Sequence, residues 1–172
     1  LGYYNTFGQS LRFRAVCNSL RPVPVKSILD VGCGHGDFYP YVSSEFDVQE
    51  FWGVDIIPDF IDVCAERYPD NSGEWHCGTV FDLDRNFDAV VAMGVFTRRS
   101  PDSREIWKST VNEMFLRSNQ VVTFSILTKS EPREHEWAVS LTEVAQFAES
   151  LSEKVVIDRR TLPYSAVCSI YK

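Results

Sequence analysis

Two patterns of apolar residues alternate along the chain. Short runs of consecutive apolar residues are followed by segments in which apolar residues recur every three or four positions. The first pattern is typical of strands buried on both faces, and the second of helices with one apolar face. The apolar runs predict strands over residues 25–31, 50–56, 73–80, 87–95, 120–127, 154–160 and 165–171.

The helical pattern occupies most of the intervals between these strands. It predicts helices over residues 36–46 and 59–68, and a third helix with Ser100 as its N-cap and Pro101 as its first residue. The apolar face of the third helix comprises Ile106, Trp107, Thr110, Val111, Met114 and Phe115. Strands that alternate with helices predict an α/β sheet with crossover helices.

The last part of the chain predicts one helix followed by a pair of strands. Ser140 and Glu143 form a capping box in front of the helix. Its apolar positions are Leu141, Val144, Ala145, Ala148 and Leu151. Only residues 161–164 separate the last two strands, which is too few for a parallel crossover. We therefore expect the last strand to be antiparallel.

Composition and charge narrow the classes of function. Hydrophobic residues make up 44% and charged residues 24% of the 172 residues, as in folded globular domains. The net charge of −7 disfavours nucleic acid as a partner. No apolar stretch approaches the ~20 residues that span a bilayer, and the first residues lack the regions of a signal peptide. We expect a cytoplasmic protein without membrane contact, as a monomer or weak homodimer.

The five cysteines are widely spaced and include no C-x-x-C pair. This spacing indicates neither a metal site nor redox exchange, so no metal is expected. We expect each of them to be a small buried hydrophobic residue: Cys17, Cys33, Cys64, Cys77 and Cys168.

Residues 27–38, SILDVGCGHGDF, place three alternating glycines directly after a predicted buried strand. Gly32, Gly34 and Gly36 allow positive φ and leave room for a ligand at the carboxyl end of the strand. The N–H groups of the following helix favour a carboxylate or phosphate. Asp37 occupies the third glycine position of the dinucleotide fingerprint G-x-G-x-x-G, which disfavours an NAD-dependent oxidoreductase.

The segment DVGCGHG resembles the D/E-x-G-x-G-x-G motif of class I S-adenosylmethionine-dependent methyltransferases, and the similarity extends over residues 27–172. It implies a doubly wound, three-layer α/β sandwich with a mostly parallel sheet of seven strands, in the order 3-2-1-4-5-7-6, strand 7 being antiparallel. It also implies one methyltransferase domain, in which residues 1–24 form a helical segment covering the cofactor site and residues 25–172 a Rossmann-like core. The implied cofactor is S-adenosyl-L-methionine, and the product is S-adenosyl-L-homocysteine.

The resemblance also implies cofactor contacts at the ends of the first three strands. The methionine part is bordered by Asp30, Gly32, Cys33, Gly34 and Gly36. Asp55 accepts hydrogen bonds from both ribose hydroxyls, and Ile56 lies along the adenine. In CGTVFDL, Thr79 stands where the family has an acidic residue. The candidates for the adenine contact are therefore the Thr79 hydroxyl, the Val80 backbone and Asp82.

The segment after the fourth predicted strand, AMGVFTRRS, resembles small-molecule methyltransferases and lacks the N/D-P-P-Y/F tetrad of enzymes that methylate nucleobase and glutamine amino groups. The resemblance places residues 93–95, beginning with Met93, under the cofactor sulfonium and Phe96 near the transfer site. Arg98 and Arg99 are candidates to pair with an acidic acceptor, the alternative being a solvated basic loop.

The N-terminal segment predicts a helix after Asn5. At spacings of three and four, its residues Gln9, Arg12 and Val16 share one face. Because an N-terminal helix often lies across the cofactor in this family, we expect Arg12 to pair with the methionine carboxylate and Gln9 to assist. Tyr3 and Tyr4 are then expected to help close the acceptor pocket.

Methyl transfer is an in-line displacement in which positioning of the reactants does most of the catalytic work. No catalytic residue is identified, and His35, Arg98 and Tyr4 are weak candidates. The alternative for His35 is that it only lines the cofactor site. His135 and Trp137 lie in a polar insert after the fifth predicted strand. The expected function is methyl transfer to a small molecule at oxygen, nitrogen, sulfur or carbon. The alternatives are a catalytically silent cofactor-binding subunit and, disfavoured, an NAD-dependent oxidoreductase.

Overall fold

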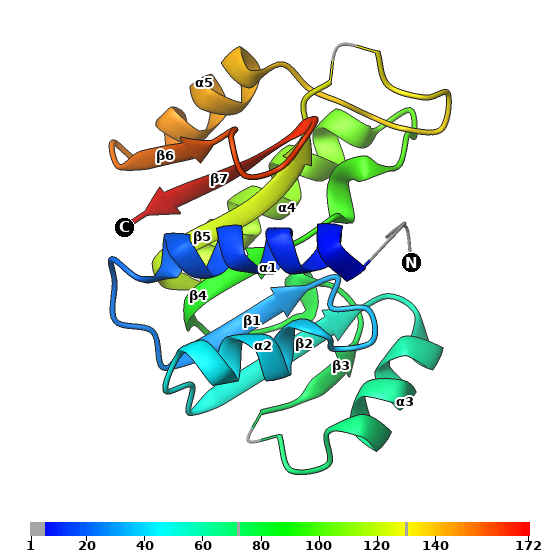
Figure 1. The fold of residues 1–172 in the computed structure, drawn as a ribbon, viewed down its shortest axis with the longest axis vertical. Coiled ribbons are helices and arrows are strands. Elements are labelled where there is room, and N and C mark those ends of the chain that lie inside the picture. The colour runs from blue at the N-terminus through cyan, green and yellow to red at the C-terminus, as the bar shows by residue number, and fades with distance from the viewer. Residues whose placement is uncertain (1–5, 72, 130) are drawn as a thin grey trace.

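The computed structural model describes residues 6–71, 73–129 and 131–172, which fold around one seven-stranded sheet in the order β3-β2-β1-β4-β5-β7-β6 (Figure 1). The strands are β1 (Ser27–Val31), β2 (Glu50–Asp55), β3 (Trp75–Cys77), β4 (Phe87–Ala92), β5 (Ser118–Leu127), β6 (Val155–Asp158) and β7 (Ser165–Tyr171). The first five are parallel, and β7 runs antiparallel to both β5 and β6. The expected fold class, strand order and antiparallel last strand are confirmed.

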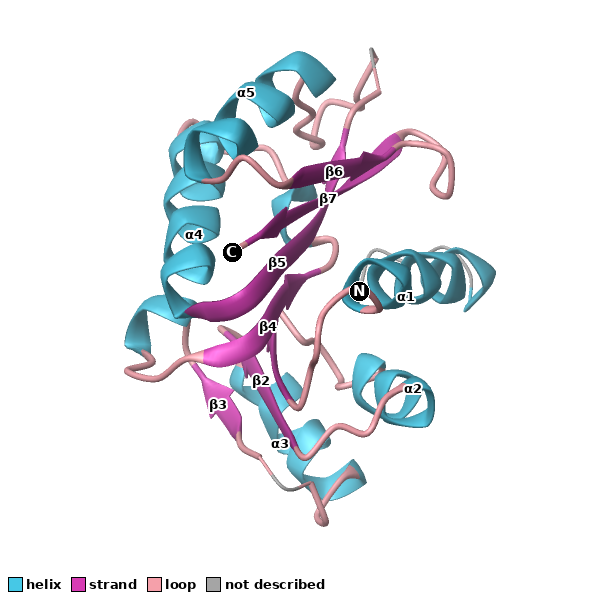
Figure 2. Cartoon of the chain, turned by 90° about the vertical axis from the view of Figure 1, so that its left-hand side faces the viewer, coloured by secondary structure: helices cyan, strands magenta, loops and turns pink. Residues whose placement is uncertain are grey.

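The described residues also form five helices, the first of which precedes β1, and two short 3₁₀ turns. They are α1 (Thr6–Leu20), α2 (Phe38–Glu45), α3 (Pro58–Arg67), η1 (Val80–Asp82), η2 (Val95–Thr97), α4 (Ser103–Arg117) and α5 (Leu141–Leu151). Figure 2 shows α1 and α2 on one face of the sheet and α4 and α5 on the other. None of the helices in the described ranges is long and apolar enough to cross a membrane.

Each face of the sheet carries its own apolar core because the strands are covered on both sides. On the face of α4 and α5, the fully buried Trp107 packs its ring 5.0 Å from that of Phe147. On the opposite face, Phe13 of α1 lies 5.2 Å from Phe38 of α2. Val16, predicted on the same helix face as Gln9, is fully buried in this second core. Both layers therefore hold the central strands rigidly.

The beginning of α4 differs from the prediction. The helix starts at Ser103 with Asp102 as its N-cap, so the assignment of Ser100 and Pro101 to its first turn is wrong. The Ser103 hydroxyl accepts a hydrogen bond from the Ser100 N–H at 2.8 Å and donates to the Ser100 carbonyl at 2.9 Å. These contacts close a separate turn, which places Pro101 before the helix.

The α5 helix has the predicted N-cap, with the Ser140 hydroxyl accepting from the N–H of Glu143 at 3.2 Å, which is one of the two hydrogen bonds of the predicted capping box. The Glu143 carboxylate pairs with Arg104 of α4 at 2.8 Å. The two helices on this face are thus connected by charge as well as by apolar packing.

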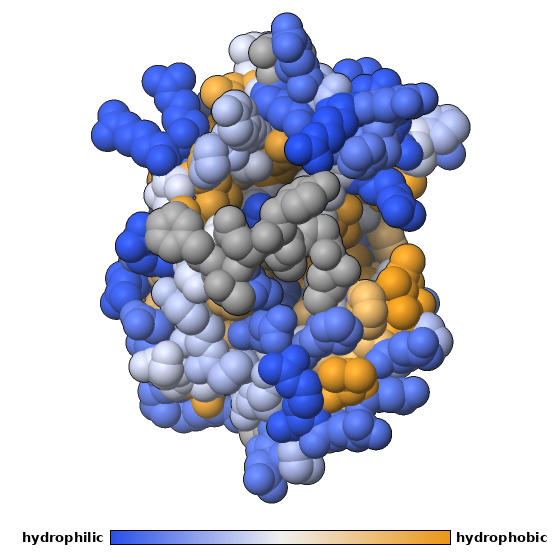
Figure 3. Space-filling model, turned by 45° about the vertical axis from the view of Figure 1, so that its right-hand side comes forward, coloured by the Kyte–Doolittle hydropathy of each residue, from blue (hydrophilic) through white to orange (hydrophobic). Residues whose placement is uncertain are grey.

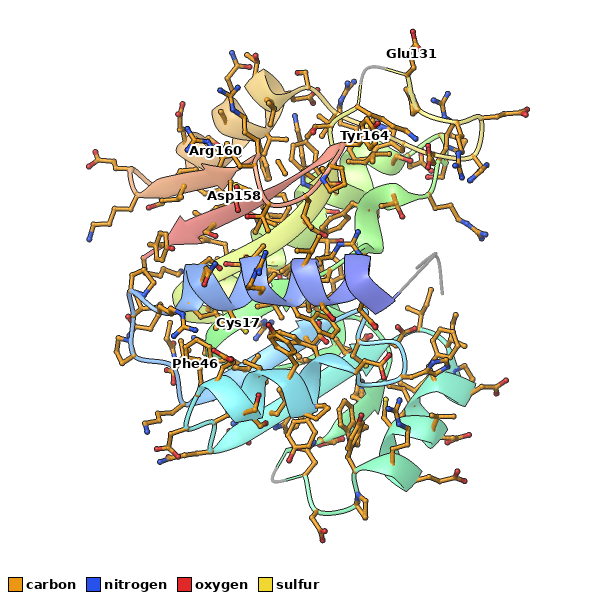
Figure 4. All side chains as sticks on the ribbon, viewed as in Figure 1. Cys17, Phe46, Glu131, Asp158, Arg160 and Tyr164 are labelled. Atoms are coloured by element: carbon orange, nitrogen blue, oxygen red, sulfur yellow. The ribbon has the colours of Figure 1, made fainter. Side chains whose placement is uncertain are left out.

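The connection between β6 and β7 is a short turn held by Asp158, which Figure 4 labels. Its Oδ1 accepts hydrogen bonds from the N–H of Arg160 at 2.8 Å and of Thr161 at 3.2 Å. The carbonyl of Tyr164, which has a φ of 62°, accepts from the N–H of Thr128 at 2.8 Å. This contact fixes the start of β7 beside the end of β5.

Several predicted strands are shorter in the structure. β3 has three residues because the chain turns at Gly78 into η1, and β4 ends at Ala92 because Gly94 adopts a φ of +80° before η2. Both turns lie at the carboxyl ends of the parallel strands. Of the cysteines, Cys17, Cys33, Cys64 and Cys168 are buried as expected. Cys77 is exposed at the end of edge strand β3, so the expectation of burial is wrong there.

Candidate cofactor site

A cavity of about 700 Å³ opens at the carboxyl ends of β1, β2 and β4 and is covered in part by α1. Parallel strands of a doubly wound sheet direct their connecting loops toward such a position. Figure 3 views this side of the molecule and shows apolar side chains at its surface. The exposed apolar residues that line the cavity include Ile56, Ile57, Phe81, Val95 and Ile106. Monomeric proteins seldom expose so many large apolar residues together unless a ligand covers them.

Two of the glycines after β1 meet strict spatial limits. Gly32 has a φ of +71°, and a Cβ there would lie 2.5 Å from Cγ2 of Val95 across the cavity mouth. At Gly36, with a φ of +72°, a Cβ would lie 2.9 Å from the Tyr68 ring. Gly32 and Gly34 line the cavity, as do Cys33 and His35. Gly36 instead faces the packing of α3 and β3, which corrects its expected place beside the cofactor.

Asp30, at the carboxyl half of β1, is a buried carboxylate that faces the cavity. It is 2% exposed, and among the described residues its Oδ1 has no hydrogen-bond partner. Burial, reinforced by the charges of Cys64 and Asp55, raises the pKa of Asp30 well above its usual value. A buried carboxylate in this state is matched by a cationic donor from the cavity side. The ammonium group of a bound amino acid moiety has this chemistry.

Asp55, the last residue of β2, is fixed by two backbone donors. Its Oδ2 accepts from the Gly34 N–H at 3.0 Å, and its Oδ1 accepts from the Ile57 N–H at 3.0 Å. Each carboxylate oxygen has further acceptor capacity for a ligand hydroxyl. Ile56, directly after it, is 71% exposed and lines the cavity. The pair offers two acceptors next to an apolar surface.

The turn after β3 forms a second apolar wall. Thr79 and Val80 line the cavity together with Phe81. The Thr79 hydroxyl donates to Asp82 at 2.8 Å, and its N–H donates to the same carboxylate oxygen at 2.7 Å. The Thr79 backbone hydrogen bond lowers the pKa of Asp82. Asp82 therefore forms part of a capping box. Val80 is the first residue of the 3₁₀ turn, and an N–H group at this position has no acceptor within the turn.

Helix α1 is held against the glycine loop by Asp37. Gln9 donates to Oδ2 of Asp37 at 3.2 Å, while Arg67 of α3 donates to Oδ1 at 2.8 Å and to the His35 carbonyl at 2.8 Å. Arg12, one turn after Gln9, lines the cavity. The carboxylate of Asp37 thus joins three segments. Sequence reasoning noted this residue only as a departure from a glycine fingerprint.

The remaining predictions near the cavity have mixed outcomes. Met93, Gly94 and Val95 line the cavity, whereas Phe96 lies in the core with its ring centroid 6.0 Å from that of Phe124. The rings of His35 and Phe60, both in the cavity lining, form a T-shaped contact with their centroids 4.5 Å apart. Tyr3 and Tyr4 lie outside the described residues. Lining residues that the sequence did not assign to the cofactor or acceptor site include Phe13, Ile57, Phe60, Phe81, Ile106 and Thr110.

Arg98 and Arg99 stand at the cavity edge and belong to an ordered pairing of two loops. The Arg99 N–H donates to the His135 carbonyl at 2.9 Å, and its Nε donates to the Glu136 carbonyl at 3.0 Å. Trp137 then packs 5.8 Å from Trp107. The insert after β5 thus supports the arginine segment, with His135 as a backbone partner and Trp137 as an anchor in the core.

Comparison with known proteins gives a family match over half of the chain. The model of the methyltransferase domain family matches residues 28–114. A fatty-acid O-methyltransferase of Mycolicibacterium smegmatis is 38% identical over 69 residues, which is 38% of this chain and 25% of that protein. A cyclopropane-fatty-acyl-phospholipid synthase of Escherichia coli is 27% identical over 104 residues, or 60% of this chain and 27% of that protein. The chain spans about a quarter of the length of these curated relatives.

Solved structures share the fold at low sequence identity. Magnesium protoporphyrin IX methyltransferase from Synechocystis, with bound S-adenosylhomocysteine, has a TM-score of 0.77 and 12% identity, over 100% of this chain and 90% of that one. The N-methyltransferase NodS from Bradyrhizobium japonicum has a TM-score of 0.73 and 15% identity, over 99% of both chains. A small RNA methyltransferase has a TM-score of 0.72 and 13% identity, over 100% of this chain and 26% of that one. With its glycine loop after β1 and its antiparallel β7, the chain belongs to the methyltransferase domain family and has the class I, S-adenosylmethionine-dependent methyltransferase fold.

Proposed function

We propose that the chain is an S-adenosylmethionine-dependent methyltransferase that acts on a small acidic molecule with an apolar body. The observation that carries the cofactor assignment is Asp30, a buried carboxylate whose Oδ1 lacks a partner among the described residues and which faces the cavity. When bound, the cofactor supplies a methyl group already activated as a sulfonium.

The cavity residues match the parts of this cofactor one by one. Asp30 accepts from the ammonium group, and Arg12 pairs with the carboxylate from the α1 side. Asp55 binds the two ribose hydroxyls, since both of its oxygens are already oriented by backbone donors. Ile56 and Phe81 cover the adenine faces, and the Val80 N–H donates to the ring. Met93 lies under the sulfonium.

The acceptor assignment rests on the other side of the cavity. Arg98 and Arg99 line the cavity together with apolar residues, including Ile106 of α4. A carboxylate on an apolar body fits both features. The relative named as a fatty-acid O-methyltransferase and the structural neighbour named for magnesium protoporphyrin IX support this class. A structural neighbour named as an RNA methyltransferase points to a polymer acceptor, which the net charge of −7 disfavours.

A carboxylate acceptor also explains why catalysis needs few specialised groups. Such an oxygen is ionised at neutral pH and attacks the methyl group without losing a proton. The chain then has to hold the two reactants in line and exclude water. His35 remains the candidate base for an acceptor that carries a hydroxyl or an amine.

The test is calorimetric titration of the chain with S-adenosylmethionine and S-adenosylhomocysteine, repeated on Asp55→Ala, with NADH as the rival ligand. We expect micromolar binding of both adenosyl ligands, weakened by the substitution, and no binding of NADH. Transfer of a labelled methyl group is then measured on matched acids, alcohols and amines of the same chain length. Binding with no transfer to any acceptor would favour the catalytically silent subunit, and preference for NADH would refute the cofactor assignment.

A further inference from the structure

Two buried cysteines lie next to each other beneath the cavity, and methyl transfer makes no use of them as a pair. Cys33 belongs to the glycine loop, lines the cavity and is 8% exposed. Cys64, on α3, is fully buried. Together with Ile61 they form a small apolar cluster of their own, separate from the two main cores.

Both sulfur atoms lie against the same backbone oxygen. The Cys64 thiol donates to the Gly34 carbonyl at 3.2 Å, and the Cys33 sulfur lies 3.8 Å from that oxygen. Two thiols that lie against one carbonyl oxygen, on segments 31 positions apart in the sequence, are candidates for a disulfide.

The two thiols are chemically unequal. The interaction with the Cys33 side chain lowers the pKa of Cys64, with a smaller effect of Arg67 in the same direction. The interaction with Cys64, together with burial, raises the pKa of Cys33. The sulfur that forms a thiolate more readily therefore lies behind the sulfur that a solute in the cavity can reach.

We propose that Cys33 and Cys64 are a redox modification site, which a hydroperoxide entering the empty cavity converts into a disulfide. The Cys33 sulfur attacks the peroxide, forming an S–O bond as the O–O bond breaks and releasing water with the thiol proton when the reagent is hydrogen peroxide. The Cys64 sulfur then attacks this sulfenic acid, forming the S–S bond, and the hydroxide that leaves takes the Cys64 proton as a second water. Two thiols are oxidised and one peroxide is reduced.

Disulfide formation disturbs the glycine loop at Gly34. The Gly34 carbonyl loses the thiol donor of Cys64, while the N–H of the same residue holds Asp55. A buried carbonyl left without its donor favours a shift of the loop, which moves the Asp55 anchor. We expect the affinity for S-adenosylhomocysteine to fall about tenfold. This second step rests on the proposed cofactor site, whereas formation of the disulfide does not.

The sequence makes the crosslink simple to detect. Trypsin cleaves after Lys26 and after Arg67, so Cys33 and Cys64 fall in one peptide, residues 27–67, that contains no other cysteine. The purified chain is treated with hydrogen peroxide, alkylated and digested, and the peptide masses are measured by mass spectrometry. We expect this peptide to lose two hydrogen atoms and to escape alkylation, to be restored by dithiothreitol, and to be protected when S-adenosylhomocysteine is bound beforehand.

Variants separate the disulfide from other oxidation. Cys64→Ser keeps a donor for the Gly34 carbonyl and should retain its ligand affinity after peroxide, and Cys64→Ala replaces it if the serine variant does not fold. Cys77→Ser removes an exposed thiol and should respond like the wild type. A peptide 27–67 that is fully alkylated after peroxide would overturn the proposal. So would equal loss of affinity in wild type and Cys64→Ser. Absence of S-adenosylhomocysteine binding in the untreated chain would refute the cofactor site and leave the mass measurement as the test of the disulfide.

Discussion

The backbone N–H of Gly34 donates to the carboxylate of Asp55 at 3.0 Å and thereby ties the glycine loop to the end of β2. Asn at position 55 would present its amide nitrogen to one of the two backbone donors. Asp55→Asn should therefore disturb the loop as well as remove a ligand acceptor, and lower cofactor affinity by about ten- to a hundredfold. Calorimetry measures the loss, and Asp88→Asn, at the amino end of β4, is a control far from the cavity. Unchanged affinity in Asp55→Asn would contradict the ribose assignment.

Asp30 should cost stability in the unliganded protein. Its pKa is raised above the usual 3.8, so the folded state binds a proton more tightly than the unfolded state does. The contribution of Asp30 to the free energy of unfolding is then most favourable below pH 3.8 and declines as the pH rises from there toward the raised pKa. Asp30→Asn stays neutral, so its free energy of unfolding should exceed that of the wild type by about 1–3 kcal/mol at neutral pH and differ little from it in acid.

The same substitution should weaken cofactor binding, because a neutral amide attracts an ammonium group less than a carboxylate does. Denaturant unfolding at acidic and neutral pH, with calorimetry on both proteins, measures the two effects. A variant that is less stable at neutral pH and binds equally well would disprove both.

Gly32→Ala should destabilise the chain through two separable causes. The positive φ of +71° costs about 1–3 kcal/mol for a residue with a side chain, and the added Cβ would collide with Val95. Val95→Ala removes the methyl group, Cγ2, that would lie 2.5 Å from this Cβ. Thermal unfolding of both single variants and of the double variant should show partial recovery in the double variant. Full recovery would mean that the backbone conformation carries no strain, and no recovery that the contact does not matter.

Asp37→Ala should loosen α1 more than it destabilises the fold. Its ion pair with Arg67 is substantially exposed, which limits the contribution to at most about 1 kcal/mol. The loss of the Gln9 contact releases the helix that carries Arg12, so cofactor affinity should fall several-fold. Hydrogen exchange should be faster in α1 and unchanged in α5. Gln9→Ala is the matched variant and should reproduce part of the effect, and protection of α1 equal to wild type would count against this role.

Arg98→Ala should act on the acceptor alone. Arg98 lies on the loop after β4, whereas Asp30 and Asp55 belong to β1 and β2, so the KM for a carboxylate acceptor should rise about tenfold while S-adenosylhomocysteine affinity stays constant. The matched variant Arg98→Lys keeps the charge and should recover part of the loss. A KM raised equally for an uncharged acceptor would argue against recognition of an acid.

The sequence patterns were sufficient to predict the elements that depend only on the apolar residues of their own segment. The run at residues 165–171 is strand β7 with the predicted bounds, and the short loop before it correctly indicated an antiparallel direction. Asp30 and Asp55, which line the cavity, were indicated by the resemblance of their segments to class I methyltransferases.

Features that depend on contact between distant segments could not be read in this way. The turn closed by Ser100 and Ser103 competes with a capping pattern that is equally plausible locally. The place of Gly36 is decided by the rings of Tyr68 and Trp75, and the bridging role of Asp37 by helices on either side of it. Local periodicity contains no information on such partners.

The pairing of the Arg98–Arg99 segment with the insert around Glu136 has a consequence for how substrate choice can diversify. In the proposed function, the nucleoside contacts come from the ends of β1, β2 and β3, whereas Arg98 and Arg99 lie after β4 and are supported by the insert after β5. Changes in the insert are therefore expected to alter acceptor preference while the nucleoside contacts stay the same. We expect grafting of the insert of a relative onto this chain to change its acceptor specificity.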